Sequence, residues 1–310
     1  MPGSEFDVAE LAAWCAQHLG SEPTETLFSA GNLASVFGLR LRDGRTIVVK
    51  VRPAEQRLEG CTQVQRHLWR AGFPCPEPLA GPLPLGATRY AVNAESLVTG
   101  GAPYPSAAGP ERARAFASLL ARLIALAPPP SEVRDLSPSP AWIDWDHSYP
   151  GVWPPPDDRD VDLNQLPDTA WLDELGRAAR TRLATTRTAA PIIGHCDWES
   201  HNLEFRDGEP QAVHDWDSVA CAAETVIVGV AAAMWPAGAD SVGATIEQSA
   251  QFLDAYQHAR GEILSSERIE ETWAAGTWIR AFNAKKFQLD GLDTLSAAEA
   301  EERARRAGLG

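Results

Sequence analysis

Two short apolar segments near the middle of the chain each end in acidic residues. The first is APIIGHCD, residues 190–197, and the second is PQAVHDWD, residues 210–217. Between them, LEF and the turn sequence RDGEP predict a hairpin, because Asp-Gly between strand-like runs is a strong turn signal. Such a hairpin would bring Asp215 beside Asn202, and Asp197 lies five residues before Asn202. The pattern therefore predicts that two aspartates and one asparagine meet at one end of paired strands.

Two kinds of site fit this cluster. Oxygen ligands such as Asn202 and Asp215 suit Mg²⁺, which binds few carboxylates and keeps room for substrate phosphates. Asp197 would then be free to accept a proton from a hydroxyl group. The alternative is a metal-dependent hydrolase with His and Asp ligands. Its ligands would be His195, Asp197, His201, His214 and Asp215. That alternative accounts for the histidines, but it explains neither Asn202 nor the lysine of the N-terminal part.

This lysine, Lys50, lies in the apolar run TIVVKV. Residues 34–41 and 45–51 are strand-like and are joined by an Asp-Gly turn, which predicts a second hairpin. A lysine within such a strand is costly to bury without an anionic partner. The segment SAGNLASVFGL before it is rich in small residues and is a candidate phosphate loop. Its candidate ligand-binding residues are Ser29, Gly31, Asn32 and Ser35.

The hydrophobic spacing changes along the chain. Amphipathic helices are expected at residues 6–19 and 55–71, and a further strand at residues 89–98. Beyond this strand, apolar residues recur mostly at helical spacing. We expect an α+β protein with two parts, a β-rich part at residues 1–98 and a mostly helical part at residues 99–310.

Composition excludes several classes of protein. The formal net charge of −15 argues against nucleic-acid binding, since phosphate contacts need basic patches, and it permits a cationic partner. No apolar run reaches the length of a membrane span. The five cysteines include no CxxC pair, which is typical of reduced thiols in a cytoplasmic protein.

The spacing HxDxxxxN followed by DWD resembles the catalytic and metal-binding loops of protein-kinase-like enzymes. The form found here is closer to the aminoglycoside phosphotransferase and choline kinase group, and the resemblance covers residues from about 25 to 290. It implies a bilobal fold, with a small β-rich N-lobe that holds one helix and a larger helical C-lobe. It also implies ATP and Mg²⁺. Lys50 would contact the phosphates, Asp197 would be catalytic, and Asn202 and Asp215 would bind the metal.

The resemblance implies two further features of the N-terminal part. A hinge near Glu95 to Leu97 would bind adenine through backbone groups. A residue of the helix at 55–71 would hold the lysine. Glu59 comes earlier in that helix than the family usually places its glutamate, so Gln63 and Gln65 are open alternatives.

Residues 141–168 contain three tryptophans and seven aspartates against one arginine. Aspartates with tryptophans suit a cationic acceptor, through ion pairing and cation–π contact. The candidate acceptor-binding residues are Trp145, Asp146, Trp153, Glu199 and Asp217. An aminoglycoside-like or other cationic antibiotic would fit, as in a resistance enzyme. A metabolic kinase for choline, homoserine or a sugar is the alternative, and a non-catalytic kinase-fold ligand-binding protein is a third. The sequence leaves open the choice between ATP and GTP and the oligomeric state.

Overall fold

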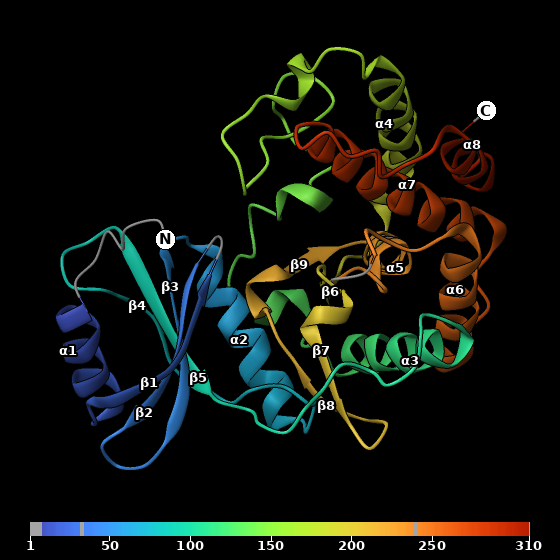
Figure 1. Cartoon of the computed structure of the whole chain (residues 1–310). Helices are drawn as coiled ribbons and strands as arrows, with labels where there is room; N and C mark the ends of the chain where they lie inside the picture. The colour runs from blue at the N-terminus through green and yellow to red at the C-terminus, as the bar shows by residue number, and fades with distance from the viewer. Residues whose placement is uncertain (1–7, 32–33, 239–240, 310) are drawn as a thin grey trace.

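The computed structural model describes residues 8–31, 34–238 and 241–309. A β-sheet with two helices forms the N-terminal part, and helices dominate the remainder (Figure 1). The predicted α+β class is therefore confirmed. Among the described residues, no helix combines the length and the apolar character that a membrane span requires.

The sheet has five antiparallel strands in the order β1-β2-β3-β5-β4. Their bounds are β1 Pro23–Gly31, β2 Ser35–Leu41, β3 Thr46–Pro53, β4 Pro78–Pro84 and β5 Tyr90–Ser96. The predicted hairpin is β2–β3. Strand β4, which contains three prolines, was not predicted; it is an edge strand, where proline is tolerated.

Strand β3 separates core side chains from cleft side chains by its period of two. Ile47, Val49 and Val51 point to one face and are buried against α1 (Val8–Leu19), which contributes Trp14 to the same core. Lys50 therefore stands on the opposite face, away from this core.

Helix α2 (Arg57–Arg70) lies between the sheet and the helical part (Figure 1). Its apolar residues Cys61, Val64 and Leu68 belong to the larger, C-terminal core rather than to the core of the sheet. The helix therefore joins the two parts by its packing.

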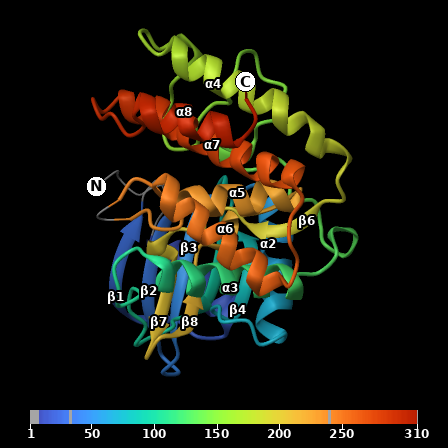
Figure 2. The ribbon, with the colours of Figure 1, turned by 90° about the vertical axis from the view of Figure 1, so that its right-hand side faces the viewer.

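The C-terminal part surrounds two small antiparallel sheets. One pairs β6 (Ile192–His195) with β9 (Val219–Ala222), and the other is the predicted hairpin of β7 (Leu203–Arg206) and β8 (Glu209–Val213). The helices are α3 Pro110–Leu126, α4 Ala170–Leu183, α5 Glu224–Met234, α6 Ile246–Arg260, α7 Ser266–Gln288 and α8 Ala297–Arg306. Figure 1 places α4, α7 and α8 far from strands β1 to β3, and Figure 2 shows α4 at the top with α7 and these strands below it.

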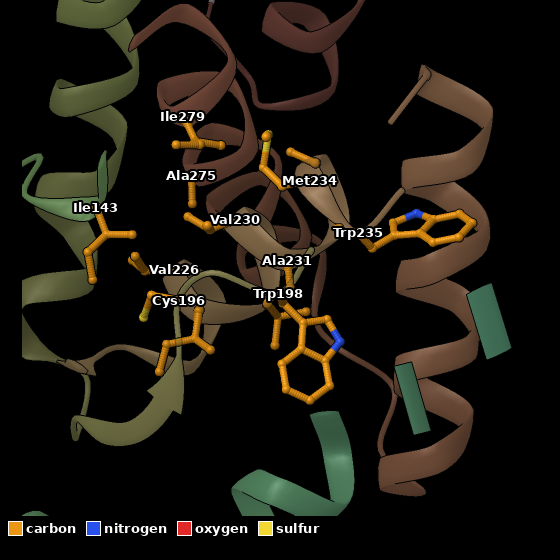
Figure 3. Close-up of a cluster of buried hydrophobic side chains, with 14 of the residues drawn as sticks. Ile143, Cys196, Trp198, Val226, Val230, Ala231, Met234, Trp235, Ala275 and Ile279 are labelled. Carbon is orange, nitrogen blue, oxygen red and sulfur yellow. The ribbon is translucent and has the colours of Figure 1, made fainter. Parts of the chain in front are cut away.

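Helix α5 is the centre of the larger core. Its residues from Thr225 to Met234 are all buried, and it packs on α7. At Gly229 an added Cβ would lie 2.1 Å from the carbonyl oxygen of Thr272, so this close approach requires glycine. Figure 3 shows side chains of α5 and α7 meeting the loop that carries Cys196 and Trp198. This packing supports the loop that follows β6.

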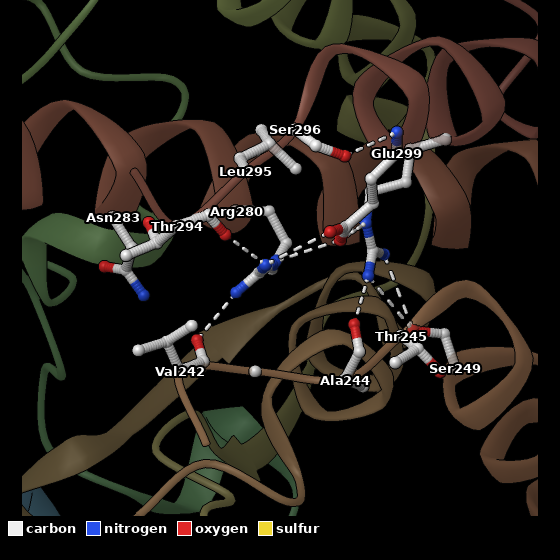
Figure 4. A network of polar contacts seen from close by, with 12 residues as sticks. Val242, Ala244, Thr245, Ser249, Arg280, Asn283, Thr294, Leu295, Ser296 and Glu299 are labelled. Atoms are coloured by element: carbon white, nitrogen blue, oxygen red, sulfur yellow. Dashed lines mark hydrogen bonds and ion pairs between the residues drawn. The ribbon is translucent and has the colours of Figure 1, made fainter. Parts of the chain in front are cut away.

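Helix α8 is held to α7 by buried ion pairs. Glu299 accepts hydrogen bonds from Arg280 of α7 and from Arg303 of its own helix (Figure 4). Both guanidinium groups also donate to backbone carbonyl groups, among them those of Val242 and Ala244.

Candidate active site

The loop after β6 brings Asp197 and Asn202 into direct contact. The Nδ2 atom of Asn202 donates to the Oδ2 atom of Asp197 at 2.7 Å and to its backbone oxygen at 3.0 Å. Asn202 is buried, and its carbonyl oxygen accepts from the amide of His214 at 2.9 Å, which fixes the loop beside the end of β8. Among the described residues, no hydrogen bond is formed to the side-chain oxygen of Asn202.

Asp215 follows β8 in a left-handed conformation, with φ 63° and ψ 51°. This conformation is uncommon for a residue other than glycine and is often found at functional sites. One carboxylate oxygen lies 3.7 Å from the Nζ atom of Lys50, and the other accepts a hydrogen bond from Ser218. The predicted residues Asp197, Asn202, Asp215 and Lys50 thus lie together where β3 meets the C-terminal part.

His195 supports this loop. Its Nε2–H donates to the carbonyl oxygen of His214 at 2.8 Å, and its Nδ1 accepts from the amide of Asp197 at 3.3 Å. Both ring nitrogens are used in this neutral form, and burial lowers the pKa of His195 to about 4. Among the residues that the structure describes, no group of three or more His, Cys, Asp or Glu side chains is placed to hold a metal ion. The geometry therefore does not favour the hydrolase alternative.

The pKa values of Asp197 and Asp215 are shifted in opposite directions. Burial and the charge of Asp215 raise the pKa of Asp197 to about 6. Burial acts in the same direction on Asp215, but the charge of Lys50, a side-chain hydrogen bond with Asp217 and the charge of Arg52 together outweigh it and lower the pKa of Asp215. The oxygens of Asn202 and Asp215 are hard donors, and their small number leaves room for phosphate oxygens. They fit Mg²⁺.

The partner of Lys50 differs from the prediction. Its Nζ atom lies 3.5 Å from a carboxylate oxygen of Glu95 on β5, whereas Glu59 is half-exposed and pairs with Arg134. The Gln65 side chain donates to the other oxygen of Glu95 at 2.9 Å. Glu59 is therefore wrong as the partner of Lys50, because at the start of α2 it faces the loop of Arg134 rather than the sheet. Gln63 is directed to the same loop, where its Oε1 atom accepts from the amide of Arg134.

At the expected hinge, the side chain of Glu95 and the backbone N–H of Leu97 already have partners within the protein. The side chain of Glu95 faces Lys50, and the amide of Leu97 donates to the carbonyl oxygen of Thr46 at 3.1 Å. The Leu97 N–H is thus used to extend the sheet. Adenine recognition by other backbone groups at the end of β5 stays a prediction.

The candidate phosphate loop is the turn between β1 and β2. Gly31 pairs with Ser35 across this turn, and an added Cβ on Gly31 would lie 2.1 Å from the carbonyl oxygen of Ala34. Ser29 is exposed on β1. Asn32 lies outside the described residues. The turn therefore requires glycine at position 31 for steric reasons.

A cleft of about 610 Å³ extends from this turn to Asp215 and Asp217 and to the segment 141–168, which is predicted to bind the acceptor. Gly31 and Ala34 line it from the sheet, and Asp215 and Asp217 line it from the C-terminal part. The predicted segment contributes Trp142, Asp144, Tyr149, Pro154, Pro155 and Asp157. Acidic and aromatic side chains therefore face the same space as Asp215.

Three predicted acceptor-binding residues do not line this cleft. Trp153 is 1% exposed, packs against Trp278, and donates its indole N–H to Asp173. Trp145 is buried with Arg187 over its ring, and Asp146 is paired with the same arginine. These predictions are wrong, because packing against α4 and α7 turns the side chains away from the cleft.

The other two predicted acceptor-binding residues lie close to the site. Asp217 lines the cleft and forms an ion pair with Arg52. Glu199 lies beside His201, 3.5 Å from its Nδ1 atom, and burial together with the charge of Asp197 raises the pKa of Glu199 to about 8. Arg52 was missed by the sequence analysis, although its position two residues after Lys50 places it on the same face of β3.

Comparisons with known proteins agree with this geometry. The model of the phosphotransferase enzyme family (APH) matches residues 24–275. A search of curated proteins found none that matches. Among solved structures, the amicoumacin kinase hAmiN in complex with AMP-PNP, Ca²⁺ and Ami is 12% identical, with a TM-score of 0.65 over 98% of this chain and 92% of that chain.

Two further structures have the same fold. Spectinomycin phosphotransferase APH(9)-Ia, in complex with ADP and spectinomycin, is 13% identical, with a TM-score of 0.57 over 98% of this chain and 94% of that one. A thermostable mutant of aminoglycoside phosphotransferase APH(4)-Ia, in ternary complex with ADP and hygromycin B, is 15% identical, with a TM-score of 0.57 over 97% and 99%. The fold is thus protein-kinase-like, and the family match covers most of the sequence. The chain belongs to the phosphotransferase enzyme family.

Proposed function

We propose that this protein is an ATP- and Mg²⁺-dependent kinase that transfers the γ-phosphate to a hydroxyl group of a small cationic molecule. The observation that carries the proposal is the convergence of Asp197, Asn202, Asp215 and Lys50 at one place, from which Asp215 also lines the cleft. In this proposal residues 1–98 form the nucleotide-binding lobe, and residues 99–310 form the catalytic and acceptor-binding lobe.

The nucleotide would lie between the two parts. Lys50 would pair with its phosphates, and the turn between β1 and β2 would cover them. Lys50 is suited to an anionic ligand, because burial would lower its pKa but Glu95, Asp215 and Asp217 together raise it, so that it stays charged. Support comes from the related structures, which contain AMP-PNP or ADP.

The metal would be held by the side-chain oxygens of Asn202 and Asp215. When bound, Mg²⁺ neutralises charge on the phosphate oxygens. The side chain of Asn202 is already fixed for this task, because its Nδ2 group donates two hydrogen bonds to Asp197.

Asp197 would orient the acceptor hydroxyl and accept its proton. The hydroxyl oxygen forms the new bond to the γ-phosphorus, the bond between that phosphorus and the bridging oxygen breaks, and ADP leaves. The protein contributes mainly position and charge stabilisation to such a reaction. Since the pKa of Asp197 is about 6, its carboxylate is ionised and able to accept a proton at neutral pH.

The acceptor side of the cleft favours a cation. Asp144 and Asp157 line it together with Trp142 and Tyr149. The nearby cation Arg52 is already paired with Asp217. Carboxylates and aromatic faces in one cleft attract ammonium groups. A cationic antibiotic of the aminoglycoside type is therefore the first candidate, and a cationic metabolite such as choline is the second.

The experiment is ADP release by purified protein with ATP and Mg²⁺ across a panel of acceptors. The panel holds aminoglycosides, cationic peptide antibiotics, choline, ethanolamine, homoserine, macrolides and simple sugars. We expect acceptor-dependent release with at least one cationic compound, and a phosphorylated product by mass spectrometry. Release with neutral acceptors alone would overturn the cationic assignment. Zinc-dependent hydrolysis without nucleotide binding would replace the kinase proposal.

A further inference from the structure

Kinases of this fold need their β3 lysine held in place, and in protein kinases a glutamate from the neighbouring helix holds it. Helix α2 has no carboxylate near Lys50 in this protein. Its one glutamate, Glu59, is paired with Arg134 at 3.0 Å. The sheet itself supplies the anion, because Glu95 of β5 lies 3.5 Å from the Lys50 Nζ atom.

Glu95 is fixed more firmly than a surface carboxylate. Its side chain is 10% exposed, and that of Lys50 is 12% exposed. Strands β3 and β5 are adjacent, and Val48 pairs with Glu95 while Lys50 pairs with Asn93. Both charged side chains therefore project from one face of the sheet at neighbouring positions, and their relative placement is set by the strand register.

Helix α2 restrains this pair through neutral groups. The Gln65 amide bridges the carboxylate of Glu95, at 2.9 Å, and the carbonyl oxygen of Pro76, at 3.1 Å. One turn earlier, Thr62 accepts a hydrogen bond from Asn93 at 2.8 Å. The helix is thus attached to β5 by two side-chain hydrogen bonds.

The other end of α2 is attached to the C-terminal part. Arg57 donates to the backbone oxygens of Asp217 and Val219, at 2.5 Å and 2.7 Å. The position of Lys50 relative to Asp215 is therefore set by the sheet and by a helix pinned at both ends. A rotation of α2 would not remove the anion from Lys50, since that anion belongs to β5.

We propose that Glu95, held by Gln65, is the positioning residue for Lys50 and takes the place of the helix glutamate in this enzyme. The proposal deepens the kinase function above and rests on it. Its consequence is that the lysine is in position before any ligand arrives.

The side chains of residues 95 and 65 are joined by a hydrogen bond. The central test removes the carboxylate from position 95 and then introduces one at position 65. Glu95→Gln is expected to lower kcat/KM for ATP by about 100-fold, through misplacement of Lys50. The KM for ATP should rise while the KM for the acceptor stays unchanged. A folding defect would instead lower the amount of active enzyme and leave both KM values as they are. The double variant Glu95→Gln with Gln65→Glu returns a carboxylate to the site from α2.

We expect kcat/KM for ATP to be at least tenfold higher in this double variant than in Glu95→Gln. Recovery should be partial, because a glutamate at position 65 cannot donate to the carbonyl oxygen of Pro76. The comparison variant is Glu59→Gln, which removes a carboxylate from the same helix and is expected to leave both KM values unchanged. The proposal is overturned if Glu95→Gln has wild-type kinetics, if the double variant recovers nothing, or if Glu59→Gln shows the larger loss.

A second measurement tests Lys50 without any turnover. The sequence holds three lysines, Lys50, Lys285 and Lys286, so selective ¹³Cε-lysine labelling yields three NMR signals, and Lys50→Arg identifies one of them. Glu95→Gln should move the Lys50 signal, and the double variant should move it back, with the other two signals unchanged. An unmoved signal overturns the role of Glu95 even if the enzyme is active. A moved signal in a protein without kinase activity would overturn the proposed function alone.

Discussion

The cleft and the helical part both bury charged side chains, but they satisfy them differently. In the helical part, the fully buried Lys285 lies 2.6 Å from both Asp173 and the hydroxyl of Thr169. At the cleft, Lys50 has no ion pair shorter than 3.5 Å among the described residues. Buried atoms beside it, Oδ1 of Asn93 and Oδ1 of Asp217, have no hydrogen-bond partner there.

The glutamates of the helical part follow the first pattern. Glu224 accepts hydrogen bonds from Tyr256, Arg260 and Arg268, at 2.6 to 3.2 Å. Buried polar groups in proteins are almost always satisfied, and exceptions need a reason. The helical part also contains buried atoms without a partner, such as Oδ1 of Asp158, so the contrast rests on the two lysines. Lys285 is paired at 2.6 Å and helps to hold the fold together, while Lys50, with ion pairs of 3.5 and 3.7 Å, is available to a ligand.

The largest effect is expected from Asp197→Asn. The variant keeps an oxygen that can accept from Asn202, so the loop should fold as before, but it cannot accept the hydroxyl proton. We predict a loss of turnover of about 10³-fold, with AMP-PNP binding and thermal unfolding close to wild type. Steady-state kinetics with the best acceptor would measure it. Turnover near the wild-type value would remove Asp197 from its catalytic role.

Glu299→Ala tests whether the buried ion pairs of the helical part stabilise the fold. It removes the carboxylate shared by Arg280 and Arg303, whose side chains are 4% and 0% exposed. Leaving such charges uncompensated costs about 3–5 kcal/mol of unfolding free energy. Glu302→Ala on the same helix removes exposed ion pairs with Arg305 and Arg306, and should lower the unfolding free energy far less. Urea unfolding of both variants would compare them, and equal costs would refute the distinction.

Acid should destabilise the protein through His195. Its pKa is about 4 in the folded protein against an ordinary value of 6.5, so below pH 6.5 the unfolded chain binds a proton that the folded one does not. His195 does not change the free energy of unfolding above pH 6.5. Below this pH the free energy of unfolding falls, and the loss due to His195 reaches about 3 kcal/mol at pH 4.

Urea unfolding between pH 7 and pH 4.5 would measure this slope in the wild type and in His195→Gln. The slope should be shallower in His195→Gln, which cannot take up the proton. His67→Gln, at an exposed position on α2, is the control and should keep the wild-type slope. An equal slope in all three proteins would show that the acid sensitivity comes from other groups.

A smaller effect is expected from Lys50→Arg. The charge is kept, so the unfolding free energy should change by less than about 1 kcal/mol, but the larger planar group cannot occupy the same position between Glu95 and Asp215. We predict a fall in kcat/KM for ATP of about 100-fold. An arginine variant with full activity would mean that any positive charge at this position suffices.

The sequence predicted the elements whose signals are local. The Asp-Gly turns predicted both hairpins, and the positions of Asp197, Asn202 and Asp215 predicted that these three side chains meet. Edge strand β4 was missed, because its prolines resemble a loop. The partner of Lys50 was missed for another reason: the sequence analysis considered only the helix residues Glu59, Gln63 and Gln65, and only the pairing of β3 with β5 brings Glu95 beside Lys50.

For acceptor binding, the sequence predicted the segment 141–168 but not which of its residues line the cleft. Trp142 and Trp153 lie in the same acidic stretch with similar neighbours, yet Trp142 lines the cleft and Trp153 is buried against α7. The sequence contains no local signal for this difference, because it depends on helices that lie more than a hundred residues away.

The central claim is that Lys50 and Asp215, which are paired only at 3.7 Å, are held for a nucleotide and its metal. Isothermal titration of AMP-PNP, with and without Mg²⁺, into wild-type protein and Asp215→Asn tests it most directly. We predict that Mg²⁺ tightens binding to the wild type at least tenfold, and that Asp215→Asn abolishes this gain while nucleotide binding without Mg²⁺ persists. Binding that is equally tight without Mg²⁺, or no nucleotide binding by the wild type, would contradict the account.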